Sequence, residues 1–254
     1  MKKRPQKQFD WLLESPIAHR GLHDDKTEEN SLEAFKAAAD KGYGIELDVH
    51  LLKDGKLAVF HDFNLKRICG VGKRIENLTS EELKNYPMKK DGQKIPLLEE
   101  VFEAVDGRVP VLIEIKSLSF FNRRLEKILL ETVEKYKGKN IVAIQSFNVF
   151  SVKYLIKHGA QYPIGQLYST PNFIIITFKN DKLVFKGFNP PDFIAYDVRK
   201  LPEKLLHKDK PAQDFPILIW TVNSNNARIK ATNFGNNIIF ENIDPEEKND
   251  KQSR

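Results

Sequence analysis

The sequence predicts an α/β fold, a TIM-type (β/α)8 barrel with a small insertion after its third strand. Three observations support this prediction. Short runs of apolar and β-branched residues alternate with segments of helical periodicity. Most of these runs are continuously apolar, as strands buried on both faces are. The alternation extends over about 250 residues, which is the usual length of such a barrel.

Nine short runs are candidate strands, one more than a barrel of eight strands needs. They cover residues 17–18, 45–49, 57–60, 111–115, 141–144, 163–167, 193–196, 217–221 and 238–240. The link over residues 50–56 contains Asp54-Gly55 and is too short for a crossover helix. One of the nine runs is therefore expected to be an edge hairpin or to lie in a loop. A doubly wound open sheet is the alternative, but the glycine-rich dinucleotide loop of many such folds is absent.

Segments with helical spacing separate most of the candidate strands. Amphipathic periodicity predicts helices over residues 31–41, 97–105, 123–136 and 150–158. Asn30-Ser31 is a plausible start for the first helix, and Gly42 and Gly159 are plausible ends for the first and the last.

Two segments break the alternation. Residues 64–94 are polar, contain three glycines and a short helical pattern at 79–86, and predict an inserted subdomain or lid. Residues 173–192 carry Asn180-Asp181 between apolar runs and predict a second excursion. We therefore expect a single barrel domain over residues 1–254, with residues 64–94 inserted, a flexible basic N-terminus at 1–10 and a flexible tail at 246–254.

Composition excludes several classes of protein. The chain has 254 residues, of which 41% are hydrophobic, and this excludes wholesale disorder and fibrous structure. The single cysteine, Cys69, excludes an intramolecular disulfide and suits a reducing, cytoplasmic location. No apolar run approaches the roughly 18 residues of a membrane helix. The basic N-terminus is not followed by an apolar stretch, so a secretory signal is not expected either.

The formal charge of +6 does not indicate a nucleic-acid partner. Four positive charges lie in the first seven residues, and the others are interspersed with acids, as on solvated helix faces. No zinc-finger spacing or RNA-binding signature is present. Peripheral contact with a membrane surface stays open as an alternative, and the sequence does not indicate an oligomeric state.

Polar residues repeatedly occupy the carboxyl ends of the candidate strands. In a barrel these ends form one face, and barrel enzymes carry their active sites there. This convergence is the strongest functional signal in the sequence. The residues concerned are His19, Arg20, Glu46, Asp48, His61, Glu114, Lys116, Gln145 and Trp220.

Three of these residues are acids in apolar surroundings. Glu46 and Asp48 are two positions apart on one strand, so their side chains point the same way. Burying them together with Glu114 would cost several kcal/mol per charge, of the order of ~3–5, unless cations compensate. Three convergent carboxylates predict an oxygen-ligand site for Mg²⁺ or Ca²⁺. The alternative is a set of buried ion pairs with Arg20 and Lys116.

The remaining polar residues suggest the chemistry. His19 and His61 follow separate strands, and a pair of imidazoles can take one proton and give another near neutral pH. Arg20 and Lys116 suit a phosphate group, although they could also neutralise the acids. A dication, two cationic side chains and an acid–base pair are typical of phosphoryl chemistry. No G-x-S-x-G motif is present, and Cys69 lacks the context of a nucleophile.

The ordered motifs resemble those of the glycerophosphodiester phosphodiesterases. They are His19-Arg20-Gly21, Glu29-Asn30-Ser31, Glu46-Leu47-Asp48-Val49, Asp54-Gly55, His61-Asp62, Pro96-Leu97-Leu98-Glu99-Glu100, Ile113-Glu114-Ile115-Lys116, Gln145-Ser146-Phe147 and Trp220-Thr221-Val222-Asn223. The resemblance runs from about Pro16 to Asp244. One departure is Phe240-Glu241, where many members of the family carry Thr-Asp.

The resemblance implies a barrel that hydrolyses glycerophosphodiesters to glycerol phosphate and an alcohol, with a divalent cation. Carried over residue by residue, it implies metal ligands, an acid–base pair, phosphate contacts and a wall for the glycerol. The implied metal ligands are Glu46, Asp48 and Glu114, and the implied acid–base pair is His19 and His61. The implied phosphate contacts are Arg20 and Lys116, and the implied glycerol wall is Trp220.

Two other functions were weighed. A related barrel phospholipase would cleave lysophospholipids or phosphoinositides at a membrane surface, and would use an apolar rim near Phe120-Phe121 or the basic N-terminus as a tether. A catalytically silent binding protein is disfavoured, because every acid, histidine and cation of the expected site is present. The preferred metal and the alcohol head group are left open.

Overall fold

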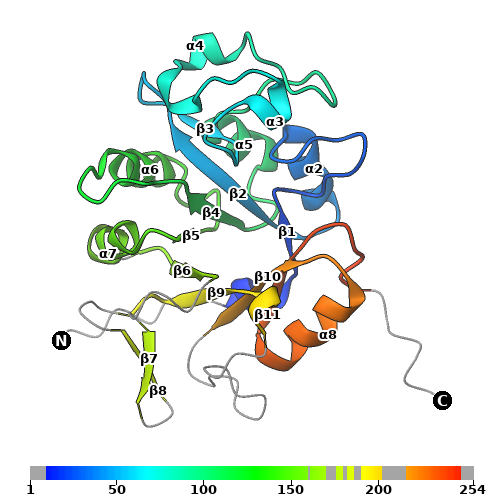
Figure 1. Cartoon of the computed structure of the whole chain (residues 1–254), viewed down its shortest axis with the longest axis vertical. Coiled ribbons are helices and arrows are strands. Elements are labelled where there is room, and N and C mark those ends of the chain that lie inside the picture. The colour runs from blue at the N-terminus through cyan, green and yellow to red at the C-terminus, as the bar shows by residue number, and fades with distance from the viewer. Residues whose placement is uncertain are drawn as a thin grey trace.

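Eight parallel strands close into a barrel in the computed structural model, which describes residues 10–159, 161–169, 176–179, 182–185, 190–201 and 216–246. Around the barrel the strand order is β1-β2-β4-β5-β6-β9-β10-β11, and β11 pairs with β1 to close the ring (Figure 1). This confirms the predicted fold class. The barrel strands are β1 (Ile17–His19), β2 (Gly44–Leu51), β4 (Val111–Ile115), β5 (Val142–Ser146), β6 (Ile164–Tyr168), β9 (Phe193–Asp197), β10 (Ile217–Val222) and β11 (Asn237–Phe240).

The extra candidate strand forms an edge hairpin. Strand β3 (Leu57–Val59) pairs antiparallel with the end of β2, and Val49 lies opposite Val59. The short link with Asp54-Gly55 makes this pairing possible, because a hairpin needs only a tight turn. Of the nine candidate strands, this one alone is not part of the barrel.

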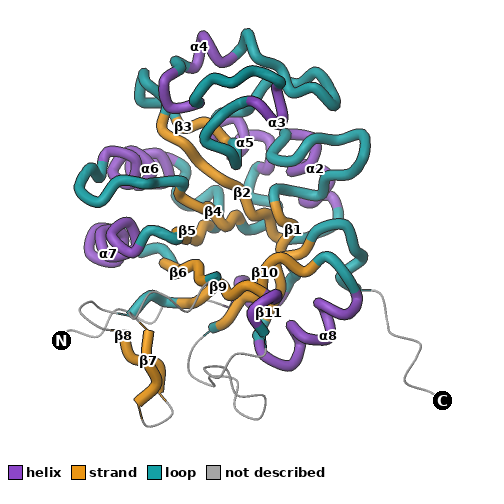
Figure 2. Tube along the Cα trace, in the orientation of Figure 1, coloured by secondary structure: helices purple, strands orange, loops and turns teal. Residues whose placement is uncertain are grey.

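Helices surround the ring of strands, as Figure 2 shows in purple around orange. The four helices predicted outside the insertion are present as α2 (Leu32–Asp40), α5 (Leu98–Val105), α6 (Arg124–Lys135) and α7 (Val149–His158). Ser31 caps α2, and its hydroxyl accepts a hydrogen bond from the Ala34 amide at 3.1 Å. Helix α8 (Asn225–Phe234) was not predicted, because its sequence is polar and only Ala231 and Phe234 are buried apolar residues.

The barrel has an inner and an outer core. Its interior is filled by a cluster that includes Ile17, Leu112, Phe193 and Leu218, while a larger cluster lies between the strands and the helices. The short helix α1 (Asp10–Glu14) adds the fully buried Leu12 to the inner cluster. The strands are therefore buried on both faces, which explains their continuously apolar sequences.

Residues 64–94 carry a small apolar cluster of their own. They form α3 (Lys66–Cys69), the 3₁₀ helix η1 (Ile75–Asn77) and α4 (Ser80–Leu83), which lie beyond β3 in Figure 1. The buried residues Ile68, Ile75 and Leu83 pack with Leu52 and Phe60 of the hairpin region. The segment is thus attached to the barrel through the β2–β3 hairpin.

The second excursion contains the antiparallel hairpin of β7 (Ile176–Lys179) and β8 (Lys182–Phe185). The turn residues Asn180-Asp181 lie outside the described residues. So do the segments expected to be flexible at the two ends of the chain, apart from Asp10 and Glu246. A second 3₁₀ helix, η2 (Val198–Lys200), follows β9.

A buried ion pair at the start of α6 yields a prediction on stability. Glu126 is fully buried, and its carboxylate accepts hydrogen bonds from Arg123 Nη1 at 2.6 Å and from the Ser151 hydroxyl. The substitution Arg123→Ala should lower the free energy of unfolding by about 3–5 kcal/mol, because it leaves a buried carboxylate without its cation.

Urea denaturation measures this loss. Arg124→Ala, at an exposed position on the same helix, is the matched control and should change the free energy of unfolding by less than about 0.5 kcal/mol. Equal stability of the two variants would contradict the role of the buried pair.

Candidate active site

The register of the barrel strands brings the polar strand-end residues together. His19 on β1 lies beside Glu46 on β2, and Asp48 on β2 lies beside Glu114 on β4. Gln145 on β5 is the next neighbour of Glu114. Because paired residues on neighbouring parallel strands point to the same side, these five side chains face one another across the barrel rim.

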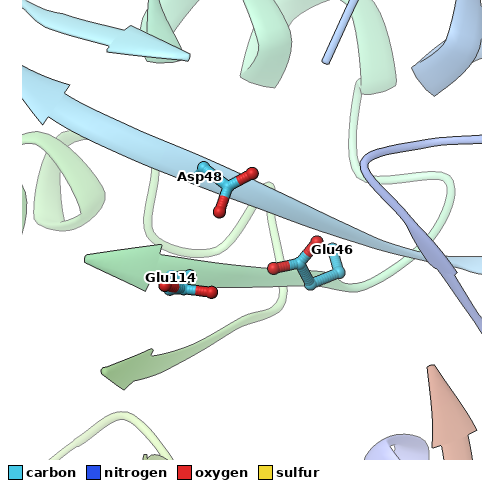
Figure 3. Close-up of side chains that lie close together, drawn as sticks. All are labelled: Glu46, Asp48 and Glu114. Atoms are coloured by element: carbon cyan, nitrogen blue, oxygen red, sulfur yellow. The ribbon is translucent and has the colours of Figure 1, made fainter. Parts of the chain in front are cut away.

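Three acids form a compact buried cluster. One carboxylate oxygen from each of Glu46, Asp48 and Glu114 lies within 4.8 Å of the others. Figure 3 shows Glu46 and Asp48 extending from β2 and Glu114 from β4. Asn30 Nδ2 donates a hydrogen bond to Asp48 Oδ2 at 2.9 Å, and the Arg20 amide donates to Glu46 Oε2 at 3.1 Å. The cluster is therefore held in place by neighbouring groups.

Two cations lie against these acids. Lys116 Nζ is 2.7 Å from Glu114 Oε1 and 3.0 Å from Asp48 Oδ1. Arg20 Nε is 3.4 Å from Asp48 Oδ2. The buried ion pairs considered as an alternative to a metal site are thus present, and they involve the same carboxylates.

The charges of the cluster do not balance. Burial raises the pKa of Glu46 well above its ordinary value, and the negative charges of Asp48 and Glu114 add to this effect. Burial also raises the pKa of Glu114 to about 7, although Lys116 opposes it. Burial also tends to raise the pKa of Asp48, but the positive charges of Lys116 and Arg20 outweigh burial and keep this pKa below its usual range.

A dication fits this arrangement. Three carboxylates face two cationic side chains, and burial together with the neighbouring acids raises the pKa of both Glu46 and Glu114. Oxygen ligands of this kind suit a hard cation such as Mg²⁺ or Ca²⁺. Asp48 Oδ1 lies 3.0 Å from Lys116 Nζ, so a cation bound there would compete with this ion pair.

Each of the two candidate acid–base histidines is bonded to a carboxylate. His19 Nδ1 lies 2.7 Å from Glu241 Oε2, and His61 Nδ1 lies 2.7 Å from Asp62 Oδ1. A carboxylate accepts a hydrogen bond, so Nδ1 carries the proton and Nε2 of each ring is left for chemistry. Burial lowers the pKa of His61; Asp48 opposes this effect, and the positive charge of Lys116 adds to it.

His61 reaches the site by a route that the sequence pattern did not reveal. It follows the antiparallel strand β3, so it does not lie at the carboxyl end of a barrel strand. The hairpin instead returns the chain to β2, and the Phe60 amide donates to the Asp48 carbonyl at 3.0 Å. This contact places His61 at the rim beside the acids.

The turn after β1 holds Arg20 in an unusual conformation. Arg20 has φ of 58° and Gly21 has φ of 81°. A Cβ on Gly21 would lie 2.8 Å from the Ala34 backbone, so only glycine fits at that position. The Asn30 amide donates to the Arg20 carbonyl at 2.9 Å, which fixes the turn against the start of α2. Strained residues of this kind concentrate at functional sites.

Four charged residues around the site were not predicted as site residues. Arg67 on α3 makes two hydrogen bonds to Glu29, at 2.7 and 2.8 Å, and its Nε donates to Asp62 at 2.8 Å. Glu29 also accepts from Arg20 Nη1 at 2.7 Å. Burial disfavours ionisation of Glu29 and Asp62, but these bonds outweigh it and lower both pKa values to about 2.

The fourth of these residues, Glu241, could have been found from the sequence. It directly follows the last strand, where the other strand-end residues pointed to the site. The hydrogen bond from His19 lowers its pKa, and burial opposes this effect. Arg67, by contrast, lies in the inserted segment, and no strand pattern points to it.

A cavity of about 620 Å³ opens above the acids. Seven of the eight predicted site residues line it, and Asp48 alone is covered by its neighbours. Phe147 and Trp220 form an aromatic wall, with ring centroids 5.5 Å apart in an edge-to-face contact. The buried Oε1 of Gln145 and Nε1 of Trp220 have no hydrogen-bond partner among the described residues. The cavity therefore combines charge, free polar groups and an apolar wall.

Three further histidines and Cys69 lie in the described part of the chain. His50 Nε2 lies 3.2 Å from the His61 carbonyl, and His158 stacks on Tyr154. His23 Nε2 lies 3.9 Å from Glu241 Oε2, and His207 lies outside the described residues. Burial raises the pKa of Cys69 to about 11, which keeps it a thiol at neutral pH. No helix in the described part of the chain is long and apolar enough to span a membrane.

Comparisons with known proteins agree with this picture. The model of the glycerophosphoryl diester phosphodiesterase family matches residues 19–242. The chain is 39% identical over 161 residues to the glycerophosphodiester phosphodiesterase of Caldanaerobacter subterraneus, covering 60% of this chain and 65% of that protein. It is 33% identical over 227 residues to lysophospholipase D GDPD1 of Homo sapiens, covering 82% of this chain and 69% of that protein. The chain thus spans about two thirds of the length of these two curated relatives.

Solved structures share the fold. The crystal structure of a glycerophosphodiester phosphodiesterase from Thermotoga maritima has a TM-score of 0.68 to this chain and 26% sequence identity. The match covers 89% of this chain and 94% of that one.

Proposed function

The chain belongs to the glycerophosphoryl diester phosphodiesterase family, and from this premise we propose that it hydrolyses glycerophosphodiesters to glycerol phosphate and an alcohol. One observation carries the proposal. A single cavity is lined by two histidines with free Nε2 atoms, two cations, two acids of the buried cluster and an aromatic wall. This combination matches the requirements of phosphodiester hydrolysis better than those of acyl or hydride transfer.

Glu46, Asp48 and Glu114 would hold a divalent cation, Mg²⁺ or Ca²⁺. The support is the set of oxygen ligands, their mutual distances within 4.8 Å and the deficit of positive charge among them. When bound, such a cation polarises a phosphoryl oxygen and neutralises charge that develops on it.

Arg20 and Lys116 would bind the phosphate. Both line the cavity, and both are already oriented by the acid cluster. Arg20 is further fixed by Glu29, whose Oε1 also accepts a hydrogen bond from Arg67. Preorganised cations of this kind stabilise the additional negative charge of the transition state without reorganising during the reaction.

The two histidines would divide the proton transfers. Because burial keeps His61 neutral, its Nε2 would take the proton of the attacking oxygen. His19 is oriented by its Nδ1 contact with Glu241 and lines the cavity, so its Nε2 would give a proton to the leaving alkoxide. Asp62 and Glu241 would orient the two imidazole rings and would exchange no proton with the attacking oxygen or the leaving alkoxide.

Trp220 would pack against the glycerol moiety. It faces the cavity with its neighbour Phe147, and its indole N–H has no hydrogen-bond partner in the described part of the chain. A glycerol carries both C–H groups that pack on a ring and hydroxyls that accept from an indole N–H.

Product identification tests this proposal. With glycerophosphocholine as substrate, ³¹P NMR of the reaction mixture should show glycerol phosphate as the phosphorus product, because His19 would give its proton to the departing alcohol. Formation of phosphocholine and glycerol would contradict the assigned orientation of the substrate, and the absence of any cleavage would contradict the function.

Lysophospholipids are a second candidate class of substrate. The specific observation in their favour is a group of exposed apolar side chains next to the cavity. A relative named lysophospholipase D is also 33% identical to this chain. The chemistry would be the same, with an acyl chain attached to the glycerol.

A further inference from the structure

We propose that an apolar ridge beside the cavity binds the acyl chain of a monoacyl glycerophosphodiester, an inference that rests on the proposed hydrolysis of the same site. The ridge consists of Leu118, Phe120 and Phe121 on the loop between β4 and α6, and of Phe147 and Phe150 around the start of α7. Both segments follow neighbouring barrel strands, β4 and β5, on the face that carries the site.

The concentration of exposed apolar groups is unusual. Seven large apolar side chains of the described residues are exposed, and five of them belong to the ridge. Phe121 is 94% exposed and Phe120 is 63% exposed. Single exposed apolar residues are common on soluble proteins, but a contiguous group marks a binding surface.

The ridge is held in place by polar contacts beneath it. Asn148 Nδ2 donates to the carbonyls of Ser117 and Ser119, at 3.1 and 2.8 Å. Arg123 Nη2 donates to the Ser119 carbonyl at 3.0 Å and also to that of Phe120. These bonds satisfy the backbone of the loop, so its aromatic side chains are presented outward on a fixed base.

The ridge continues the aromatic wall of the cavity. Trp220, the proposed glycerol wall, contacts Phe147 edge to face at 5.5 Å. Phe150, three residues after Phe147, contacts Phe120 edge to face, also at 5.5 Å. An alkyl chain attached to a glycerol at Trp220 would therefore leave the cavity past Phe147 and toward the Phe120–Phe150 pair.

This continuity identifies the occupant as an acyl chain of the substrate. The path begins at the position of the reacting molecule, and a single alkyl chain gains contact with each ring that it crosses. A ridge that only touched a bilayer would not need to join the glycerol wall.

The test compares one head group with and without an acyl chain. The substrates are glycerophosphocholine and octanoyl-glycerophosphocholine, the latter used below its critical micelle concentration. The double variant Phe120→Ser/Phe121→Ser should lower kcat/KM for the octanoyl substrate by at least about tenfold. Its kcat/KM for glycerophosphocholine should stay within about twofold of the wild type, because neither ring lines the cavity.

Ile141→Ser is the matched control. Ile141 is 51% exposed but precedes β5, at the opposite end of the barrel. It should leave both substrates unaffected. The single variant Phe121→Ser, at an almost fully exposed position, should show the same selectivity with no change in melting temperature.

Three results would overturn the inference. The ridge variants could lower kcat/KM equally for both substrates, or they could leave kcat/KM unchanged for both. The variants could also lose sedimentation with phosphatidylcholine vesicles while octanoyl turnover stays at the wild-type value, which would assign the ridge to a membrane surface. If the wild type cleaves neither substrate, the proposed hydrolysis itself fails, and this result is distinct from the other three.

Discussion

Replacing His61 or His19 with Ala should lower kcat for glycerophosphodiester hydrolysis by about 10²–10⁴-fold in each case. Each ring lines the cavity, and each is hydrogen-bonded through Nδ1 to a carboxylate. Under the proposed mechanism, loss of either ring would remove one of the two proton transfers while leaving the acid cluster intact. We therefore expect KM to change much less than kcat. Steady-state kinetics on glycerophosphocholine measures both.

His158→Ala is the matched control for these variants. His158 is an exposed residue on the outer helix α7, where it stacks on Tyr154. Its replacement should leave kcat unchanged. Full activity in both His19→Ala and His61→Ala would exclude the acid–base assignment, whatever the metal dependence.

The pH profile separates the roles of the two rings. Since burial lowers the pKa of His61 from its ordinary 6.5, the ring stays neutral to lower pH than a free imidazole. Activity that depends on neutral His61 should therefore be retained as the pH falls to 6.5 and be lost only below it. Measured at a divalent-cation concentration that keeps the acid cluster occupied, an acid limb of kcat/KM above 6.5 would contradict the assignment of His61 as the base.

Replacing Glu114 with Gln should weaken binding of a divalent cation by roughly 100-fold or more. Substituting a residue that only hydrogen-bonds to a metal ligand already lowers metal affinity by about 10–100-fold. Here a charged ligand itself is lost. The amide also leaves Lys116 with one fewer anionic partner. Isothermal titration calorimetry with Mg²⁺ or Ca²⁺ measures the affinity independently of turnover.

Two further variants make this test specific. Glu99→Gln removes one carboxylate from α5, where it pairs with Lys56 at 3.6 Å, and should leave metal affinity unchanged. Lys116→Met removes the cation that is ion-paired with Asp48 and Glu114. This variant should therefore bind the metal more tightly, but it should bind the phosphate of the substrate less well. Identical metal affinity in the wild type and Glu114→Gln would show that the cluster is a set of buried ion pairs and not a metal site.

The fold was largely predictable because barrel strands have an unusual sequence pattern. Continuous apolar runs such as 142–144 are typical of strands that are buried on both faces, and here the inner and outer cores bury them. The antiparallel direction of β3 was harder to predict from the sequence. Its apolar run resembles those of the barrel strands, and only the short link at Asp54-Gly55 indicated a hairpin. Helix α8 was missed because it buries few apolar residues.

The candidate site was predictable where it depends on strand ends, and less so elsewhere. Glu46, Asp48 and Glu114 are conspicuous as acids within apolar runs, and the strand register brings them together. Arg67 could not be inferred, because it reaches Glu29 and Asp62 from the inserted segment, whose packing has no repeating pattern. Long-range contacts of this kind depend on tertiary structure and leave no signal in the local sequence.

The central claim is that this chain hydrolyses phosphodiesters with the help of a divalent cation held by three buried acids. The most direct test is turnover of glycerophosphocholine by protein stripped of metal with a chelator, before and after addition of Mg²⁺, Ca²⁺ or Mn²⁺. We predict no turnover in the stripped protein and recovery with at least one of these ions, in the wild type but not in Glu114→Gln. Undiminished turnover by the stripped protein would contradict the account.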